Sequence, residues 1–320
     1  GWLTTYASWH WAFLINVPIG LIVLAGVLWV VPETRESSGP RGIDLPGTVL
    51  ITAGLLGVVF GLIEATRYGW IEPISTFAVG SWTWPFTSIS PVTVAFVGGL
   101  LLLGVFVLVE RRRGLAGKVV VVNLRLFGVR SFGAGNAVAL LVSLGEFGLL
   151  FALPLFLQST RGYDAMQTGV ILTALAAGSF VSSGLGAPLA QRFGPVRVLQ
   201  AGMAFEAVGI LALGFVLSTT VTGWQLAPWL FVYGMGVGFA TAQLTGVILS
   251  EVPVEQSGQA SAVQSTSRQV GAAFGTAIIG ATLIFGLGST ATQLEDRGVP
   301  APVAEQVSQA VSSSAGQAIP

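Results

Sequence analysis

Residues 9–20, WHWAFLINVPIG, open an apolar run that continues to residue 31 and decides the class of this fold. Two tryptophans and the single histidine of the chain, His10, stand at the start of the run. Indole and imidazole rings combine an apolar body with a polar edge, so they favour the boundary between hydrocarbon and water. We interpret residues 9–11 as an aromatic anchor at a membrane interface. Behind it, Pro18 is expected to kink the helix, because proline removes a backbone hydrogen bond.

The composition of the whole chain also indicates lipid as the solvent. Of 320 residues, 53% are hydrophobic and 9% are charged, against roughly 25% charged residues in soluble domains. The chain has no cysteine, which excludes disulfides, cysteine zinc sites and thiol catalysis. A single histidine argues against a histidine-ligated metal and a Ser/His/Asp triad. We therefore predict a polytopic membrane protein that is not an enzyme and holds no metal.

Apolar runs long enough to cross a bilayer recur along the chain, since about 20 helical residues span the hydrocarbon core. We predict eight spans and an all-α fold. The spans cover residues 11–31, 45–63, 91–109, 132–157, 170–189, 199–218, 226–249 and 265–287. Small residues at four-residue spacing, such as Gly57 with Gly61 and Gly271 with Gly275, predict close helix packing.

The basic residues predict the orientation, because cytoplasmic loops are enriched in Lys and Arg. Eleven of the fourteen lie on one side, including Arg268 at the border of the last span, and the other three are Arg67, Arg161 and Arg297. The first side is therefore expected to be cytoplasmic, with both ends of the chain outside. The loop that carries Trp70, Trp82 and Trp84 is then external, and we interpret its tryptophans as an interfacial belt.

Two glutamates, Glu146 and Glu206, are the only ionisable residues well inside the predicted spans. An acidic side chain at that depth costs about 2.5–3.5 kcal/mol on insertion scales, so it is a functional candidate by default. Such a group can bind and release protons. The alternative is a glutamate kept protonated, or hydrogen-bonded between helices, for packing alone.

Three stretches resemble the major facilitator superfamily, in particular its 14-span drug:proton antiporter branch. GWLTTYASWHWAFLINVPIG at residues 1–20 resembles the end of span five and the start of span six, with His10 where arginine is usual. GAPLAQRFGPVRV at residues 186–198 resembles the cytoplasmic loop motif G-x-L-A-D-R-x-G. SEVPVEQSGQASAVQSTSRQVGAAFGTAIIGATL at residues 250–283 resembles the stretch that enters span thirteen.

The resemblance implies a truncated helical bundle that covers spans six to thirteen. Residues 1–31 would end the N-terminal half, residues 32–131 would hold two linking spans and a cytoplasmic loop, residues 132–287 would supply five spans of the C-terminal half, and residues 288–320 would form an external loop. Glu146 would then lie on a cavity-lining helix and Glu206 on a peripheral one. We therefore favour Glu146 for proton or substrate coupling and a structural role for Glu206.

The loop motif departs from the family pattern at two positions. Gln191 stands where the motif has Asp, and Gly186 lies one place before the position of the first Gly. A charged contact between this loop and a helix end is therefore weakened or missing in this half of the bundle. The resemblance still implies a cytoplasmic gate loop formed by Gly186, Arg192, Gly194 and Arg197.

The implied function is proton-coupled efflux of drugs or other small organic compounds across the cytoplasmic membrane by alternating access. The expected partners are a small-molecule substrate and the lipid bilayer. No nucleic acid and no cofactor besides the proton gradient are expected, and the complete protein is expected to be a monomer. A narrow exporter or an importer of an endogenous metabolite stays open. A polytopic membrane enzyme or a scaffold is the remote alternative.

Overall fold

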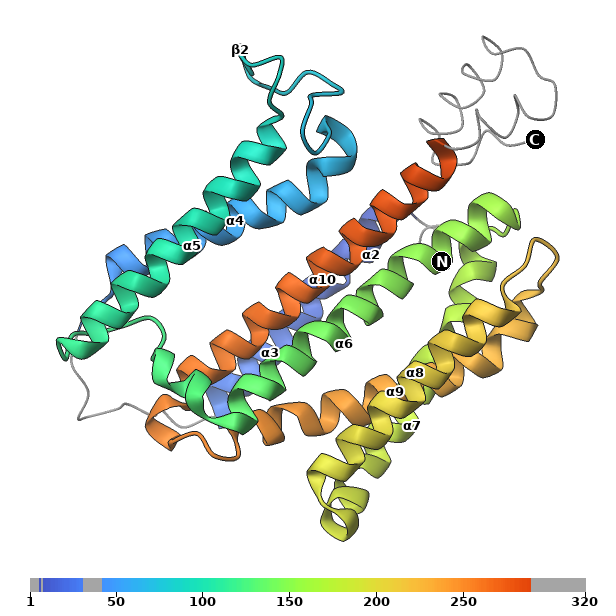
Figure 1. The fold of residues 1–320 in the computed structure, drawn as a ribbon. Helices are drawn as coiled ribbons and strands as arrows, with labels where there is room; N and C mark the ends of the chain where they lie inside the picture. The colour runs from blue at the N-terminus through green and yellow to red at the C-terminus, as the bar shows by residue number, and fades with distance from the viewer. Residues whose placement is uncertain (1–5, 7, 31–41, 289–320) are drawn as a thin grey trace. The chain divides into compact units, whose positions relative to one another are not determined.

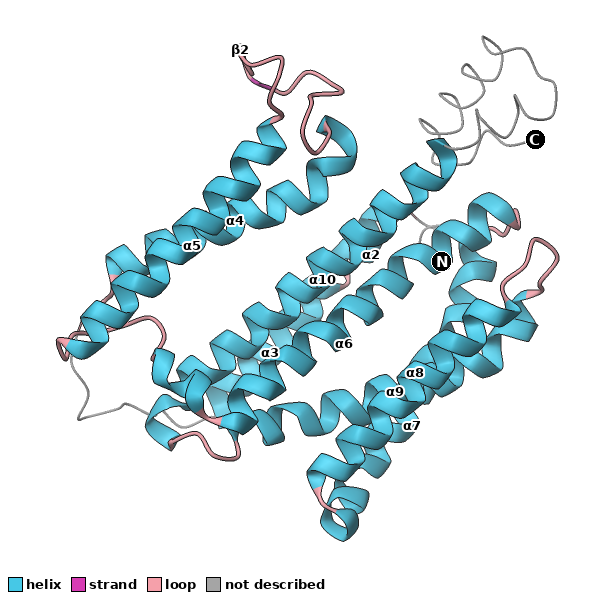
Figure 2. Ribbon diagram, viewed as in Figure 1, coloured by secondary structure: helices cyan, strands magenta, loops and turns pink. Residues whose placement is uncertain are grey.

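The computed structural model describes residues 6, 8–30 and 42–288 (Figure 1). Helices form most of these ranges, and two short strands form one hairpin (Figure 2). The helices are α2 (Trp9–Leu14), α3 (Asn16–Val30), α4 (Leu45–Tyr68), α5 (Pro91–Leu115), α6 (Arg130–Leu155), α7 (Ala165–Phe193), α8 (Pro195–Val216), α9 (Gly223–Leu249) and α10 (Ser257–Gly288). The short elements are β1 (Ala78–Val79), β2 (Trp82–Thr83), the 3-10 turns η1 (Leu124–Gly128) and η3 (Val254–Gln256), and the π-helical turn η2 (Phe156–Thr160). The prediction of an all-α membrane fold is confirmed.

Within the described ranges, six helices are long and apolar enough to cross a membrane, fewer than the eight predicted spans. They are α4 to α9, and the α6 span continues through η2 to Thr160. The other two predicted spans correspond to α3 and α10. Helix α3 has 15 residues, fewer than the about 20 needed to cross the hydrocarbon core. Helix α10 has 32 residues, but polar side chains in its first half lower its mean hydropathy.

The predicted first span, residues 11–31, is interrupted near its start. Helix α2 ends at Leu14 and α3 begins at Asn16. Pro18 has no amide to donate to the carbonyl of Leu14, and its ring crowds that carbonyl. Ile15 between the two helices keeps helical backbone angles (φ −60°, ψ −24°), so the structure shows a local loss of hydrogen bonding, and residue 31 lies outside the described residues.

The chain divides into two compact units, which are described separately. Unit 1 comprises residues 1–39 and 154–243, and unit 2 comprises residues 40–153 and 244–320. The predicted domain boundaries after residues 31, 131 and 287 separate the halves of a transporter. The two compact units do not test these boundaries. The predicted external loop at 288–320 lies almost wholly outside the described residues.

In unit 2, helices α4 and α5 form a hairpin that closes through glycines. A Cβ atom at Gly57 would lie 2.6 Å from the carbonyl oxygen of Ala95, and one at Gly61 would lie 2.7 Å from Cβ of Phe96. The predicted close packing at these glycines is confirmed. Helix α10 joins the hairpin, because Ala277 packs with Val58 and Leu62 of α4 in a buried cluster.

Local sequence determines where helices α4 and α5 begin. Asp44 caps the first turn of α4 by accepting a hydrogen bond from the amide of Gly47, and Ser90 caps α5 directly before Pro91. Side-chain oxygens at these positions satisfy amides that have no partner within the helix. Between the helices, the indole of Trp84 donates to the carbonyl of Ile89 at 2.9 Å. The interfacial belt at this loop stays a prediction.

In unit 1, helices α7 and α8 both pack against α9 through glycines. A Cβ atom at Gly178 of α7 would collide with the carbonyl of Phe231, and one at Gly209 of α8 would lie 2.7 Å from Cβ of Tyr233. Helices α7 and α8 are joined by Gly194 alone, whose φ of +88° favours glycine. This turn connects the helices that correspond to the predicted spans 170–189 and 199–218.

Candidate functional site

The candidate site lies in unit 2 between α6 and α10, which run side by side (Figure 1). Two glycines of α10 set the spacing of the helices: side chains at Gly271 and Gly275 would collide with the carbonyls of Leu140 and Leu144. The predicted packing role of both glycines is confirmed. Small residues let helix backbones approach closely, which brings the polar side chains of α6 within reach of α10.

Polar side chains on one face of α6 contact two consecutive residues of α10. The hydroxyl of Ser267 donates to Oδ1 of Asn136 at 3.2 Å, and Nε of Arg268 donates to Oγ of Ser143 at 3.3 Å. Asn136 is 4% exposed and Ser143 is fully buried. Because buried polar groups are costly unless they are hydrogen-bonded, these contacts fix the register of the two helices.

Glu146 lies one turn beyond Ser143 on the same helix face and forms an ion pair with Arg268. Nη2 of Arg268 lies 3.6 Å from Oε2 of Glu146, and the two side chains are 36% and 17% exposed. Among the described residues, Oε2 has no hydrogen-bond partner. The carboxylate is thus held by charge attraction at a distance longer than a hydrogen bond.

This arrangement can respond to a proton or to a cation. The guanidinium stays protonated in proteins, so the charge of the pair is decided by the carboxyl group. A proton on Glu146 removes the attraction and leaves Arg268 with Ser143 as its partner. A positively charged ligand could compete with Arg268 for the same carboxylate.

The structure adds a contact that the sequence interpretation of Arg268 missed. Helix α10 begins at Ser257 and places Arg268 eleven residues beyond its start, facing α6, and the position of Arg268 at the cytoplasmic border of the last span stays a prediction. The predicted span began at residue 265 because the residues before it are polar. The helical spacing between Arg268 and Gly271 is the signal that could have revealed a residue directed toward the neighbouring helix.

Glu206 occupies a different setting in unit 1. It is 7% exposed on α8, and a Cβ atom at Gly236 of α9 would lie 2.6 Å from its Cγ. Glu206 therefore faces a helix interface within its own unit. Its functional role stays a prediction, as does that of Glu146.

The predicted gate loop is divided between two helices. Arg192 lies in the last turn of α7, where its guanidinium carbon is 5.2 Å from the ring centroid of Phe193, and Arg197 lies in the first turn of α8. Gly194 forms the whole connection. Gly186 lies in the body of α7, where a Cβ atom would be 3.2 Å from Nε2 of Gln243. Gly186 thus lies within the predicted span 170–189, before the connection, and its part in a gate stays a prediction.

A second charged cluster, which the sequence analysis missed, lies at the open end of the α4–α5 hairpin. Oδ1 of Asp44 lies 3.2 Å from Nε of Arg113, and Oε2 of Glu110 accepts the amide of Val122 at 3.2 Å. Asp44 and Glu110 are 3% and 2% exposed. The signal was an acidic residue directly before three arginines, just beyond the predicted span 91–109.

Opposing effects act on the pKa of Asp44. Burial raises it, whereas the hydrogen bond from the Gly47 amide and the charge of Arg113 lower it. The lowering effects prevail, so the pKa of Asp44 lies below its usual 3.8. Asp44 is therefore charged at neutral pH, and its ion pair with Arg113 joins the start of α4 to the end of α5.

No group of three or more His, Cys, Asp or Glu side chains that could hold a metal ion occurs within the described part of the chain.

Comparison of the sequence with known proteins identifies its family. The family model described as Major Facilitator Superfamily matches residues 1–276. The chain is 31% identical over 296 residues to the probable actinorhodin transporter of Streptomyces coelicolor, which covers 91% of the chain and 48% of the relative. It is 33% identical over 286 residues to the cephamycin export protein of Amycolatopsis lactamdurans, which covers 87% of the chain and 54% of the relative.

A third relative is the puromycin resistance protein of Streptomyces alboniger, 30% identical over 304 residues, with 93% of the chain and 55% of the relative covered. The chain thus spans about half the length of the curated relatives it matches. The family match extends over most of the chain, including α6 and the part of α10 that carries Arg268. The chain belongs to the major facilitator superfamily.

Proposed function

We propose that the complete protein is a secondary transporter that exports drugs or other small organic compounds in exchange for protons. Family membership and relatives named as antibiotic exporters support this proposal. The observation that carries it is the ion pair between Glu146 and Arg268, two charged residues that face each other between long helices. Ionisable residues in such positions mark ion and substrate pathways.

The proposed mechanism couples the proton to the contact between α6 and α10. When Glu146 is ionised, it attracts Arg268 and favours the arrangement seen here. When a proton neutralises Glu146, the attraction ends and the two helices lose one of the contacts that hold their register. A cationic substrate that displaces Arg268 from the carboxylate would have the same effect. Competition of proton and substrate for one carboxylate then gives exchange, with alternating access by movement of helical bundles.

The proposal includes a location and a set of partners. The protein would be a multi-pass component of the cytoplasmic membrane, with the ends of this chain on the outer side. The complete protein would act as a monomer on a small-molecule substrate, with the proton gradient as its energy source. It would need no other cofactor and no nucleic acid.

The proposal is tested with the full-length protein in inside-out membrane vesicles, with ethidium as a cationic probe. Respiration acidifies the vesicle lumen, and accumulation of ethidium is followed by fluorescence. Wild type should accumulate the dye until an uncoupler collapses the proton gradient. Glu146→Gln should slow accumulation at least about tenfold at equal protein amounts, because the amide cannot carry the exchanged proton.

The matched control is Glu72→Gln, which makes the same chemical change at an exposed loop position. It should transport at the wild-type rate. Wild-type transport by Glu146→Gln would remove the coupling role, and transport that persists after the uncoupler would remove proton exchange.

The gate function of the α7–α8 turn is a separate part of the proposal. Arg192 and Arg197 stand at the two ends of a one-residue connection, so they move together when either helix shifts. Arg192→Ala should slow transport several-fold without changing the amount of protein in the membrane. An unchanged rate would remove this assignment.

The second candidate function is export of a single endogenous metabolite. Two of the relatives are named for one antibiotic each, actinorhodin and cephamycin, which favours a narrow substrate range. A panel of toxic compounds tested on cells that express the complete gene distinguishes the two functions. Resistance to several unrelated compounds supports broad efflux, and resistance to one compound or none supports the narrow exporter or an importer.

A further inference from the structure

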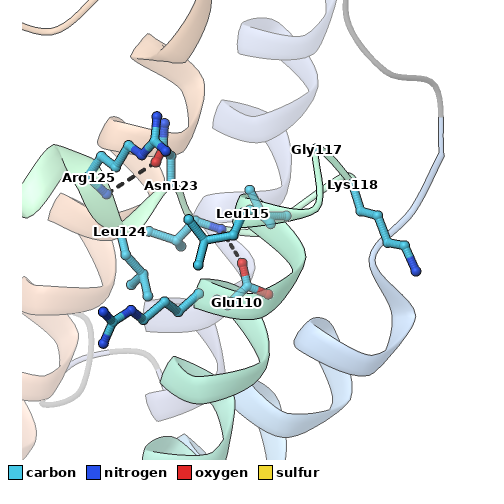
Figure 3. Close-up of a pocket in the computed structure, with 11 residues that line it drawn as sticks. Glu110, Leu115, Gly117, Lys118, Asn123, Leu124 and Arg125 are labelled. Atoms are coloured by element: carbon cyan, nitrogen blue, oxygen red, sulfur yellow. Dashed lines mark hydrogen bonds between the residues drawn. The ribbon is translucent and has the colours of Figure 1, made fainter.

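A cavity of about 450 Å³ lies at the end of α5, in unit 2 and away from the candidate transport site. The last turns of α5, the connection that follows it and the start of η1 form its walls. Figure 3 shows Glu110 and Leu115 in the middle of the pocket, Asn123 and Arg125 on one side, and Lys118 on the other. The size is in the range of sites that hold a small molecule, about 300–1,000 Å³.

The charges that line this cavity are mostly positive. Arg111, Lys118 and Arg125 line it together with one acidic residue, Glu110. All three basic side chains are exposed. Glu110 is 2% exposed and accepts the amide of Val122, so its carboxyl group lies at the buried end of the pocket, away from the exposed basic side chains. The opening of the pocket therefore attracts anions.

The walls of the cavity are fixed by contacts from three directions. The amide of Asn123 donates to Oε1 of Gln259 at 3.1 Å, and Nδ2 of Asn123 donates to Oε1 of Gln256 at 3.0 Å. On the opposite side, Arg113 donates to the carbonyl of Val119. Because α5, η3 and α10 all hold this segment, the cavity is formed before any ligand binds. Preorganised sites lose less entropy on binding.

The location of the cavity indicates the kind of anion. Helix α5 has 25 residues and qualifies as a membrane span, so its last turn lies at the level of the lipid headgroups. Leu115 is 70% exposed at the edge of the cavity, and Val120 and Leu124 also line it. Basic side chains beside an exposed apolar surface match a phosphate that is attached to a hydrocarbon chain. A free phosphate ion would leave Leu115 in water.

We propose that this cavity binds the headgroup of an anionic phospholipid, with the lipid phosphate between Arg111 and Arg125 and the acyl chains beside Leu115. Basic pockets at membrane interfaces bind such headgroups through charge attraction. The bound lipid would link the end of the α4–α5 hairpin to the segment that leads into α6. The proposal concerns lipid binding alone and does not depend on transport.

The test measures lipid binding by the purified full chain in a mild detergent. Phosphatidylglycerol and phosphatidylcholine are added separately, and native mass spectrometry gives the dissociation constant for each lipid. Wild type should prefer phosphatidylglycerol. The double variant Arg111→Gln/Arg125→Gln should bind phosphatidylglycerol about 30-fold more weakly, since each basic side chain near a lipid phosphate contributes a factor of about five.

The matched control is Arg112→Gln/Arg130→Gln, which removes the same charge from two exposed residues that do not line the cavity. It should bind within about threefold of wild type, and Arg111→Lys/Arg125→Lys, which keeps the charge, should retain the preference for phosphatidylglycerol. Elution as one symmetric peak on gel filtration shows that each variant is folded.

Three results would overturn the proposal. Equal loss of binding in the cavity variant and the control would indicate general attraction to basic residues. Equal affinity of wild type for both lipids would show that the cavity does not select a charged headgroup. Displacement of phosphatidylglycerol by millimolar inorganic phosphate would assign the cavity to a soluble anion.

Discussion

Two carboxylate–arginine pairs in unit 2 differ in how firmly they are held. Asp44 and Arg113 join α4 to the end of α5 at 3.2 Å, with the Asp44 side chain 1% exposed. Oδ1 of Asp44 also accepts the amide of Gly47 at 2.9 Å. Glu146 and Arg268 join α6 to α10 at 3.6 Å, and their side chains are 17% and 36% exposed. The first pair is tight and hydrogen-bonded, and the second is looser and partly accessible.

The difference separates a structural pair from one that can open. A buried pair with further hydrogen bonds loses them all when it separates, so Asp44 and Arg113 hold one arrangement. Arg268 has a second partner in Ser143, so it keeps a hydrogen bond when Glu146 is neutralised. The candidate for proton coupling is thus the pair with the weaker geometry, and the variants below test this contrast.

The largest effect is expected from exchanging the charges of the α6–α10 pair. Glu146→Arg and Arg268→Glu each place like charges together, and each should reduce proton-driven ethidium transport at least about 100-fold, since like charges at this distance repel strongly. The double variant restores opposite charges and should recover at least about tenfold over either single variant. A folded double variant that is as inactive as the singles would show that the charge pair is not the interaction that matters.

Removing the charge of the tight pair should affect stability more than transport. Asp44→Asn keeps a side-chain cap for α4 but leaves Arg113 without its ion-pair partner, at a cost of about 2–3 kcal/mol. The thermal unfolding midpoint in detergent should fall by roughly 5 °C. The control Asp164→Asn makes the same change at the exposed cap of α7, where no arginine pairs with the aspartate in the described residues, and should change the midpoint by less than about 2 °C. Equal shifts in the two variants would remove the structural role of the pair.

The advantage of wild type over Asp44→Asn should depend on pH. Because the pKa of Asp44 is lower in the folded protein than its usual 3.8, its contribution is complete above pH 3.8 and is lost as the pH falls through the lowered value. The difference between the unfolding midpoints should therefore shrink as the pH falls below about 3.8. A difference that grows below that pH would contradict this assignment.

The smallest effect is expected at Glu206. Glutamine has nearly the same volume and also carries hydrogen-bonding groups, so Glu206→Gln should transport ethidium within about twofold of wild type. The rate is measured in the same vesicles as Glu146→Gln. Loss of proton-driven transport in Glu206→Gln with normal rates in Glu146→Gln would move the proton site to α8.

Much of the fold could be predicted because its signals are local. Long apolar runs identify α4 to α9, Pro18 explains the interrupted hydrogen bonding before Asn16, and Gly194 followed by Pro195 gives the turn between α7 and α8. These features depend on a few neighbouring residues and on the solvent. The ends of α10 were harder to place, because a helix that packs against other helices can begin with polar residues such as those at 257–269.

The amino-acid sequence by itself determined that this chain is a membrane protein and where along the chain most of its helices lie. It also identified Glu146 and Glu206 as candidate functional residues. Only the tertiary structure decided which residues the acidic side chains contact: Arg268 faces Glu146, Gly236 lies against Glu206, and Arg113 pairs with Asp44. The physical reason is that hydropathy and turn signals act over a few residues. A side-chain contact between distant helices depends on their rotation and spacing, which the packing of glycines such as Gly271 and Gly275 sets.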